Sequence, residues 1–330
     1  MPNQSFNQFL CPSCVDGRFG AVLEKVRSSE LICTYCGIRF PVIDGIPRLV
    51  EMDNYGTSFG FQWNKHRQTQ LDSYSGLTLS KDRLLAATGW ETLADARGIK
   101  ILEAGSGAGR FTEVLLSTNS ELWSFDYSNA VEANAANNGG APNLSLFQGD
   151  IYRMPVADSY FDWVLCLGVI QHTPNPRESF RSLASKVRPG GWLAIDVYTW
   201  SLRHALQWKY LLRPITRRMN QQHLYRLLEK LLPLLLPVTR LLKRLLGRFG
   251  ARISPIVEYS QLGVSAEVNA EWALLDTFDM YAPAHDHPQS LRSVKSWFLE
   301  AGFVDIEIFY GANGVVGRGR RSSVVNEREN

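Results

Sequence analysis

The sequence lacks any long uninterrupted hydrophobic run, although 45% of its 330 residues are hydrophobic. Its leucine-rich run extends only from Leu231 to Val238 and holds Pro233 and Pro237, whereas a transmembrane helix needs about 20 apolar residues. The sequence also opens without a charged segment, an apolar segment and a small-residue cleavage site, so we expect no secretory signal. These absences predict a globular, cytoplasmic protein that can bury a full core.

Acidic residues are scarce in one part of the chain. The net charge is only +3, but residues 201–252 carry 12 Lys or Arg against Glu229 alone, so this segment carries +11 and the remainder −8. Such an uneven distribution favours an anionic partner for the basic segment, either a membrane surface or a nucleic acid.

Cysteine is rare, and four of the five cysteines fall in two pairs. Cys11-x2-Cys14 and Cys33-x2-Cys36 are separated by 18 residues, while Cys166 lies alone in an apolar run. This spacing predicts a tetrahedral zinc site, and four thiolates leave no open position, so we expect one structural zinc ion per chain. The stretches CPSC and LICTYCGIRFPVIDGIPRLV resemble the zinc-ribbon subunit that activates several methyltransferases in eukaryotes and archaea. The resemblance implies a ribbon fused to this chain.

Glycines gather at one point, in KILEAGSGAGRFTEVLL, which reads as a strand, a tight loop and a helix. Gly105, Gly107 and Gly109 form a variant of the dinucleotide fingerprint, with an arginine in place of its last glycine. Glu103 precedes the loop. Asp126, 23 residues after Glu103, ends a second strand pattern, where a carboxylate can accept hydrogen bonds from both ribose hydroxyls.

The order of elements after this loop predicts the fold. Strand and helix patterns alternate, which is typical of a parallel, doubly wound α/β sheet. The motifs EAGSGAG, FDYS, GDIYRMP, DSYFDWVLCLGVIQH and VRPGG resemble the ubiquinone and menaquinone biosynthesis type of class I S-adenosylmethionine-dependent methyltransferase. The resemblance implies a Rossmann-like seven-stranded sheet that binds S-adenosylmethionine and ends in a helix and an antiparallel hairpin.

The same resemblance implies roles for individual residues. Glu103 and the glycine loop would hold the methionine moiety, Asp126 would bind the ribose, and Asp150 with the Ile151 backbone would contact the adenine. Leu167 or Gly168 would form the floor beneath the sulfonium. The full set of expected cofactor-binding residues is Glu103, Gly105, Gly107, Gly109, Asp126, Tyr127, Asp150, Ile151, Leu167 and Gly168.

Transfer to a hydroxyl or enol also requires removal of a proton. His172, after the fourth strand, is one candidate base, and a structural role is its alternative. Tyr281, His285, Asp286 and His287 form a second candidate cluster, and a solvated turn is the alternative for its two histidines. A metal site at His285 and His287 lacks an evident third ligand.

Two further motifs carry a weaker resemblance, to methyltransferases of bacterial surface-glycan gene clusters. YGTSFGFQW, residues 55–63, is too aromatic for a passive linker, so we expect either a flap across the cofactor pocket or packing between domains. DTFDMYAPAHDH, residues 276–287, is the second motif.

The leucine-rich segment 224–250 lies in an insert after the fifth strand. Its leucines follow a helical period before and after the prolines, which predicts two amphipathic helices joined by a proline-broken turn. Three interpretations remain open: a lid over the sheet edge, contact with an anionic membrane, or binding of nucleic acid, which the few aromatic residues disfavour.

These patterns divide the chain into a zinc ribbon (1–50), an aromatic linker with helices (51–98), a cofactor-binding core (99–199), a helical insert (200–290), a final helix and hairpin (291–319) and a disordered tail (320–330). We expect a methyltransferase that acts on oxygen of a small-molecule or lipid-linked acceptor, a glycan or an isoprenoid. An RNA base methyltransferase and a cofactor-binding scaffold without turnover are the alternatives. The oligomeric state follows from none of these patterns.

Overall fold

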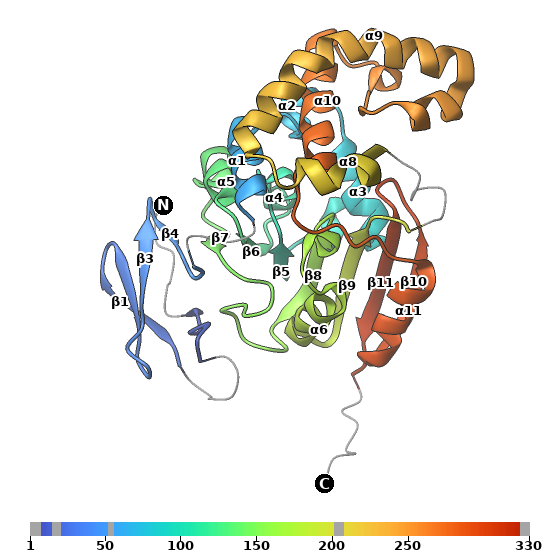
Figure 1. Cartoon of the computed structure of the whole chain (residues 1–330). Coiled ribbons are helices and arrows are strands. Elements are labelled where there is room, and N and C mark those ends of the chain that lie inside the picture. The colour runs from blue at the N-terminus through green and yellow to red at the C-terminus, as the bar shows by residue number, and fades with distance from the viewer. Residues whose placement is uncertain (1–7, 15–20, 52–55, 201–207, 324–330) are drawn as a thin grey trace.

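A computed structural model of the chain describes residues 8–14, 21–51, 56–200 and 208–323 (Figure 1). A small ribbon of antiparallel strands lies beside one edge of a larger sheet, helices cover both faces of that sheet, and further helices lie over one end of its strands. The described part of the chain holds no helix that is both long enough and apolar enough to cross a membrane.

Seven strands of the described residues form the large sheet, in the order β10-β11-β9-β8-β5-β6-β7. The strands from β5 to β9 are parallel, and β11 is antiparallel to both neighbours. The predicted Rossmann-like α/β fold with a terminal hairpin is therefore confirmed. The strands are β5 Lys100–Ala104, β6 Glu121–Asp126, β7 Leu144–Gln148, β8 Phe161–Leu167, β9 Val187–Val197, β10 Phe303–Tyr310 and β11 Val315–Arg321.

Helices pack on both faces of this sheet because both faces of its strands are apolar. Phe180 of α6 and Phe298 of α11 belong to the core on one face, while Phe111 of α4 and Val131 of α5 belong to the core on the other. The helices are α3 Leu79–Thr88, α4 Arg110–Leu116, α5 Ala130–Asn138, α6 Pro176–Lys186 and α11 Leu291–Glu300, with short 3-10 turns at Leu93–Ala96 and Ile170–His172.

The ribbon docks on the β7 edge of the sheet (Figure 1). The Leu49 N–H donates to the Gln148 carbonyl at 2.9 Å, and Arg48 forms a parallel bridge with the same residue. Phe9 packs edge-on against the rings of Trp123 and Phe147. The ribbon strands are β1 Leu23–Arg27, β2 Glu30–Cys33, β3 Arg39–Ile43 and β4 Ile46–Pro47.

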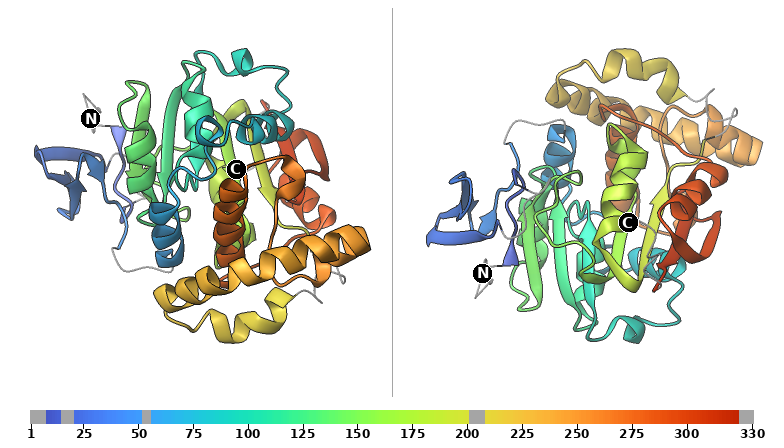
Figure 2. Two further views of the ribbon diagram at one scale, coloured as in Figure 1. Left: turned by 90° about the horizontal axis from the view of Figure 1, so that it is seen from above. Right: turned by 90° about the horizontal axis from the view of Figure 1, so that it is seen from below.

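The insert forms a helical cap over the carboxyl ends of the parallel strands (Figures 1 and 2). Its own apolar core joins leucines of α9 to Phe278 of α10 and to Phe61 of α1, a helix from the aromatic linker. The cap contains α8 Trp208–Thr216, α9 Gln221–Ile253, a 3-10 turn at Ser260–Leu262 and α10 Ala266–Tyr281, and it packs on α1 Thr57–Lys65; α2 Asp72–Ser75 follows α1 in the chain.

The predicted turn at the prolines is wrong, because α9 continues through Pro233 and Pro237. An interior proline costs a helix about 3 kcal/mol. Here, however, α9 is buried on both sides of the prolines, against α10 as far as Leu236 and against Ser254 at Thr239, which offsets that cost. The buried face of α9 consists of Leu224, Leu228, Leu232, Leu236 and Thr239. The described part of α9 instead kinks at Gly247, whose φ of 55° and ψ of −130° are not helical.

The predicted disordered tail also begins too early, since β11 runs to Arg321 and pairs with β10 there. The rest of that tail, residues 324–330, lies outside the described residues, as do Tyr55 of the aromatic motif and residues 201–207 of the basic segment.

Candidate active site

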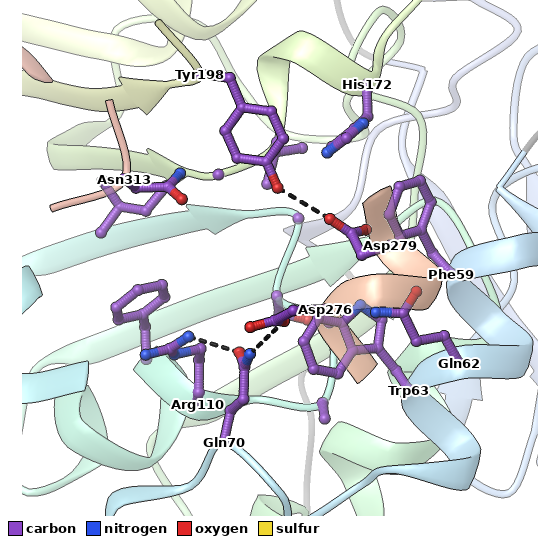
Figure 3. A pocket seen from close by; sticks show the side chains of 18 of the residues that line it. Phe59, Gln62, Trp63, Gln70, Arg110, His172, Tyr198, Asp276, Asp279 and Asn313 are labelled. Atoms are coloured by element: carbon purple, nitrogen blue, oxygen red, sulfur yellow. Dashed lines mark hydrogen bonds between the residues drawn. The ribbon is translucent and has the colours of Figure 1, made fainter. Parts of the chain in front are cut away.

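A cavity of about 700 Å³ lies between the carboxyl ends of the parallel strands and the helical cap. Its walls come from segments far apart in the sequence: the glycine loop after β5, the ends of β6, β8 and β9, the helices α1 and α10, and the loop between β10 and β11. Figure 3 shows side chains from these segments pointing toward one another.

The glycine loop forms one wall of the cavity and requires its glycines. Gly105 and Gly107 have positive φ angles of 77° and 54°. A Cβ at Gly105 would collide with the Val169 side chain, and one at Gly107 would lie 3.1 Å from the Trp63 ring. The loop therefore presents bare backbone to the cavity, with Trp63 of α1 packed across it.

Asp126 fixes the loop from the end of β6. Its Oδ2 accepts the Gly107 N–H at 2.9 Å, and its Oδ1 accepts the Ser128 N–H at 2.9 Å and the Ser128 hydroxyl at 2.7 Å. Burial raises the pKa of this carboxyl group. Asp126 and Tyr127 both line the cavity, as do Ile151 and the Leu167–Gly168 floor.

Three expected cofactor-binding residues do not line the cavity. Glu103 is buried beneath the loop, and its Oε2 accepts the hydroxyls of Thr112 at 2.5 Å and Ser124 at 2.8 Å. Burial raises the pKa of Glu103 to about 7. Gly109 caps α4, and Asp150 accepts the backbone N–H two residues ahead at 2.9 Å. In this structure they shape the loops that line the cavity.

Several buried polar atoms around the loop are left without partners. Within the described residues, no hydrogen bond reaches Ser106 Oγ, Gln62 Oε1 or Glu103 Oε1. Ser106 and Gln62 also line the cavity and are 3% and 1% exposed. Unpaired buried polar atoms cost stability unless a ligand satisfies them. The unpaired atoms of Ser106 and Gln62 fit a cofactor with amino, carboxylate and hydroxyl groups, such as S-adenosylmethionine.

His172 is the predicted base that the structure brings into the cavity. Its Nδ1 lies 3.1 Å from the His285 carbonyl oxygen, which can only accept, so Nδ1 carries the proton and Nε2 remains a free acceptor in the neutral ring. The imidazole lies between Phe59 and Tyr198, with ring centroids 5.0 and 5.3 Å away.

Of the second candidate cluster, Asp286 lines the cavity and pairs with Lys209 at 2.9 Å, whereas Tyr281, His285 and His287 do not line it. The Tyr281 hydroxyl donates to the Pro255 carbonyl at 2.7 Å, and burial raises the pKa of Tyr281 to about 12. The rings of His285 and His287 stack on each other at 5.8 Å. They belong to a strap between α10 and α11 whose backbone bonds to Gln171 and to residues that follow β9.

Sequence reasoning missed two carboxylates on α10 that do line the cavity (Figure 3). Asp279 Oδ2 accepts the Tyr198 hydroxyl at 2.9 Å. Asp276 accepts the Gln70 amide at 3.0 Å on one oxygen and the Tyr259 hydroxyl on the other. Burial raises the pKa of Asp276 to about 6. The signal was present in DTFDMY, because two Asp three residues apart lie on one helix face.

Two arginines were also missed. Arg83 donates to both oxygens of Asp196 at 2.7 Å each, and a Cβ at Gly168 would lie 2.9 Å from its guanidinium. Arg110 donates to Gln70 Oε1 at 2.6 Å, and burial lowers the pKa of Arg110 to about 10. A single arginine in a helix carries no sequence signal of such a position.

The four paired cysteines gather away from the cavity, in the ribbon. Their sulfur atoms lie within 4.8 Å of one another, with Cys11 to Cys36 at 3.8 Å and Cys14 to Cys33 at 4.0 Å. Zn–S bonds of about 2.3 Å in a tetrahedron separate the sulfurs by about 3.8 Å. The cluster therefore has the dimensions of a four-thiolate zinc site.

Comparison with known proteins shows that part of the cavity wall lies in a segment that matches a known family. Residues 102–195 match a family described as a methyltransferase domain. An uncharacterised protein of Synechococcus sp. is 34% identical over 105 residues, which are 30% of this chain and 25% of that protein. A ubiquinone biosynthesis O-methyltransferase of Bordetella bronchiseptica is 23% identical over 193 residues, 55% of this chain and 78% of the enzyme. A solved S-adenosylmethionine-dependent methyltransferase of Aquifex aeolicus is 12% identical, with a TM-score of 0.42, over 79% of this chain and 97% of that one.

Proposed function

Because the chain carries an S-adenosylmethionine-dependent methyltransferase domain, we propose that it transfers a methyl group to an oxygen of a polar acceptor, a small molecule or the glycan part of a lipid-linked one. The observation that supports this best is the cavity itself. The glycine loop and Asp126 line it together with His172 and the carboxylates of α10. An apolar isoprenoid would offer those carboxylates no hydrogen-bond donor.

The cofactor would be held by the residues that carry free polar groups. Asp126 would accept hydrogen bonds from ribose hydroxyls, while Ser106 and Gln62 would bond the amino acid end. When bound, S-adenosylmethionine supplies a methyl group on a sulfonium sulfur, which keeps the electron pair of the broken bond while the acceptor oxygen bonds the methyl carbon.

The acceptor must lose its hydroxyl proton in this reaction, and His172 Nε2 is the group we assign to receive it. The backbone carbonyl that holds Nδ1–H also stabilises the imidazolium that forms, because it accepts a hydrogen bond from a more acidic donor. Asp276 and Asp279 would accept hydrogen bonds from further hydroxyls of the acceptor and thereby orient the reacting oxygen.

The acceptor class is tested by incubating the protein with methyl-labelled S-adenosylmethionine and fractionated cell extract. We expect label in a glycan or lipid-linked glycan fraction. Label in RNA would support the base methyltransferase instead, and no label in any fraction would support the scaffold without turnover.

The base is tested with His172→Ala and a matched His223→Ala control, since His223 is exposed on α9. Removal of a general base costs about 100- to 10,000-fold in kcat. We expect that loss only for His172→Ala, with cofactor affinity unchanged. Equal activity of the two variants would remove His172 from the reaction.

We also propose that the cysteine cluster holds one structural zinc ion. Its dimensions support this, as does the small size of the ribbon, which buries little apolar surface of its own. Metal analysis of protein purified without chelator should give about one zinc per chain. A metal-free, folded ribbon would contradict the assignment.

A further inference from the structure

Helix α9 presents three distinct faces along its length. One face is buried against α10. A second face, the leucine stripe, is apolar and exposed, and consists of Leu227, Leu231, Leu234, Val238, Leu241 and Leu245. A third face, the basic row, is exposed and consists of Arg226, Lys230, Arg240 and Arg244.

The leucine stripe is long and open. Its residues follow one another at alternating steps of four and three, which keeps them on one side of the helix over about 27 Å. The most exposed are Leu234 at 70%, Leu245 at 69% and Leu241 at 55%. A single exposed leucine needs no explanation, but a continuous stripe of this length marks an interaction surface. Figure 1 shows the carboxyl half of α9 extending beyond the body of the molecule.

The charge beside the stripe decides between two occupants. A second copy of α9 would bring two basic rows together, and Glu229 is the only acid between Gln221 and Ile253 to compensate them. Arg240 already pairs with Glu258 at 3.5 Å, whereas Arg226, Lys230 and Arg244 are exposed to solvent. An anionic bilayer surface satisfies both faces at once, since its acyl region accepts the leucines and its head groups accept the basic row.

We propose that α9 docks this protein on an anionic membrane, lying in the plane of the interface with the leucine stripe inserted. The buried face of α9 packs on α10, which carries Asp276 and Asp279. Docking therefore holds the acceptor wall of the cavity close to the bilayer. The proposal rests on the surface of α9 and does not depend on the proposed methyl transfer.

Flotation of the full chain with vesicles tests the docking. Vesicles of phosphatidylcholine with phosphatidylglycerol should carry the protein upward, and phosphatidylcholine alone should not. Leu234→Asp with Leu241→Asp should lower the bound fraction at least about tenfold, because each buried leucine contributes strongly to partitioning. Leu299→Asp on α11, where the leucine is 58% exposed, is the matched control and should float like the wild type.

The contribution of charge is tested with glutamine at Arg226, Lys230 and Arg244, against glutamine at the exposed Lys81, Arg292 and Lys295. The first set should lose about tenfold or more in binding and the second little. Failure of the wild type to float, equal binding to both vesicle types, or binding unchanged by the leucine variants would overturn the proposal. So would a dimer in solution that the leucine variants dissociate without any binding to vesicles.

Discussion

At the scale of single residues, two aspartates that line the cavity are held differently. Asp126 accepts one hydrogen bond from the glycine loop and two from Ser128, so its position is set before any ligand arrives. Asp276 accepts hydrogen bonds from the side chains of Gln70 and Tyr259, which can turn toward a ligand. We therefore expect Asp126 to govern the cofactor and Asp276 the acceptor.

Substitution Asp126→Ala should weaken binding of S-adenosylmethionine by about tenfold or more, because hydrogen bonds from ribose hydroxyls to a carboxylate are lost together with the anchor of Gly107. Titration calorimetry measures this. Asp126→Asn keeps the size and one acceptor oxygen, and should fall between the alanine variant and the wild type. Unchanged affinity in the alanine variant would overturn the assignment.

Substitution Asp276→Asn should lower activity but stabilise the fold. The pKa of Asp276 is about 6 in the folded chain, above the unfolded value near 3.9. The folded state therefore binds the proton more tightly, and the wild type loses stability as pH rises from about 4 to above 6. At pH 8 the variant should be more stable by about 1 to 3 kcal/mol, the low end applying if water in the cavity screens the charge.

Urea unfolding at pH 4 and pH 8 checks this difference, which should be absent at the lower pH and present at the higher one. Acceptor binding gives the independent readout, because only the ionised carboxylate accepts two hydroxyl hydrogens. A variant less stable than the wild type at pH 8 would contradict the stability argument. A variant as active as the wild type would contradict the role of Asp276 in acceptor binding.

At the scale of elements, α9 is the helix that differs from the prediction. The sequence shows two prolines four residues apart, and local rules predict a break there. The local rules failed because they do not include the partner surfaces, which are α10 as far as Leu236 and Ser254 at Thr239. Tertiary packing outweighed backbone preference.

Pro233→Ala with Pro237→Ala tests whether the helix is continuous. Both prolines are exposed and helical, so alanine restores two backbone hydrogen bonds without a clash, and the free energy of unfolding should rise by about 1 to 3 kcal/mol. Pro142→Ala, at an exposed turn, is the control and should change little. A loss of stability in the double variant would favour a turn at the prolines.

The elements that the sequence predicted well are those with a local cause. The glycine loop and the strand ends around Asp126 and Gly168 follow from short motifs, and so does the clustering of the four ribbon cysteines. The acceptor wall could not be predicted in this way. Asp276 and Asp279 line the cavity because α10 packs against α9 and α1 over the strand ends. No spacing within the sequence predicts this packing.

At the scale of the whole molecule, a chain of contacts connects the ribbon to the cofactor wall. Arg48 is fully buried at the junction, where it donates to Gln148 Oε1 at 3.3 Å and to Glu132 at 3.1 Å. The Gln148 amide in turn donates to the Tyr127 carbonyl at 3.0 Å. Tyr127 follows Asp126 and lines the cavity. The ribbon thus supports, from outside the sheet, the segment at Asp126 and Tyr127 that we propose binds the ribose.

Loss of the ribbon should consequently weaken cofactor binding, although the cysteines do not line the cavity. Removal of zinc by a chelator should unfold the ribbon and release Arg48, and Arg48→Met should break the same link while the metal stays bound. Coupling through such a contact network is worth about 0.5 to 2 kcal/mol, so affinity for S-adenosylmethionine in Arg48→Met should fall roughly 2- to 30-fold. Calorimetry of both preparations, with metal analysis alongside, measures this.

Arg39→Met, whose side chain pairs with Glu30 on the exposed face of the ribbon, is the matched control and should bind the cofactor normally. If chelation or Arg48→Met leaves the affinity unchanged, the ribbon acts only as a separate domain, and the contacts through Gln148 carry no coupling.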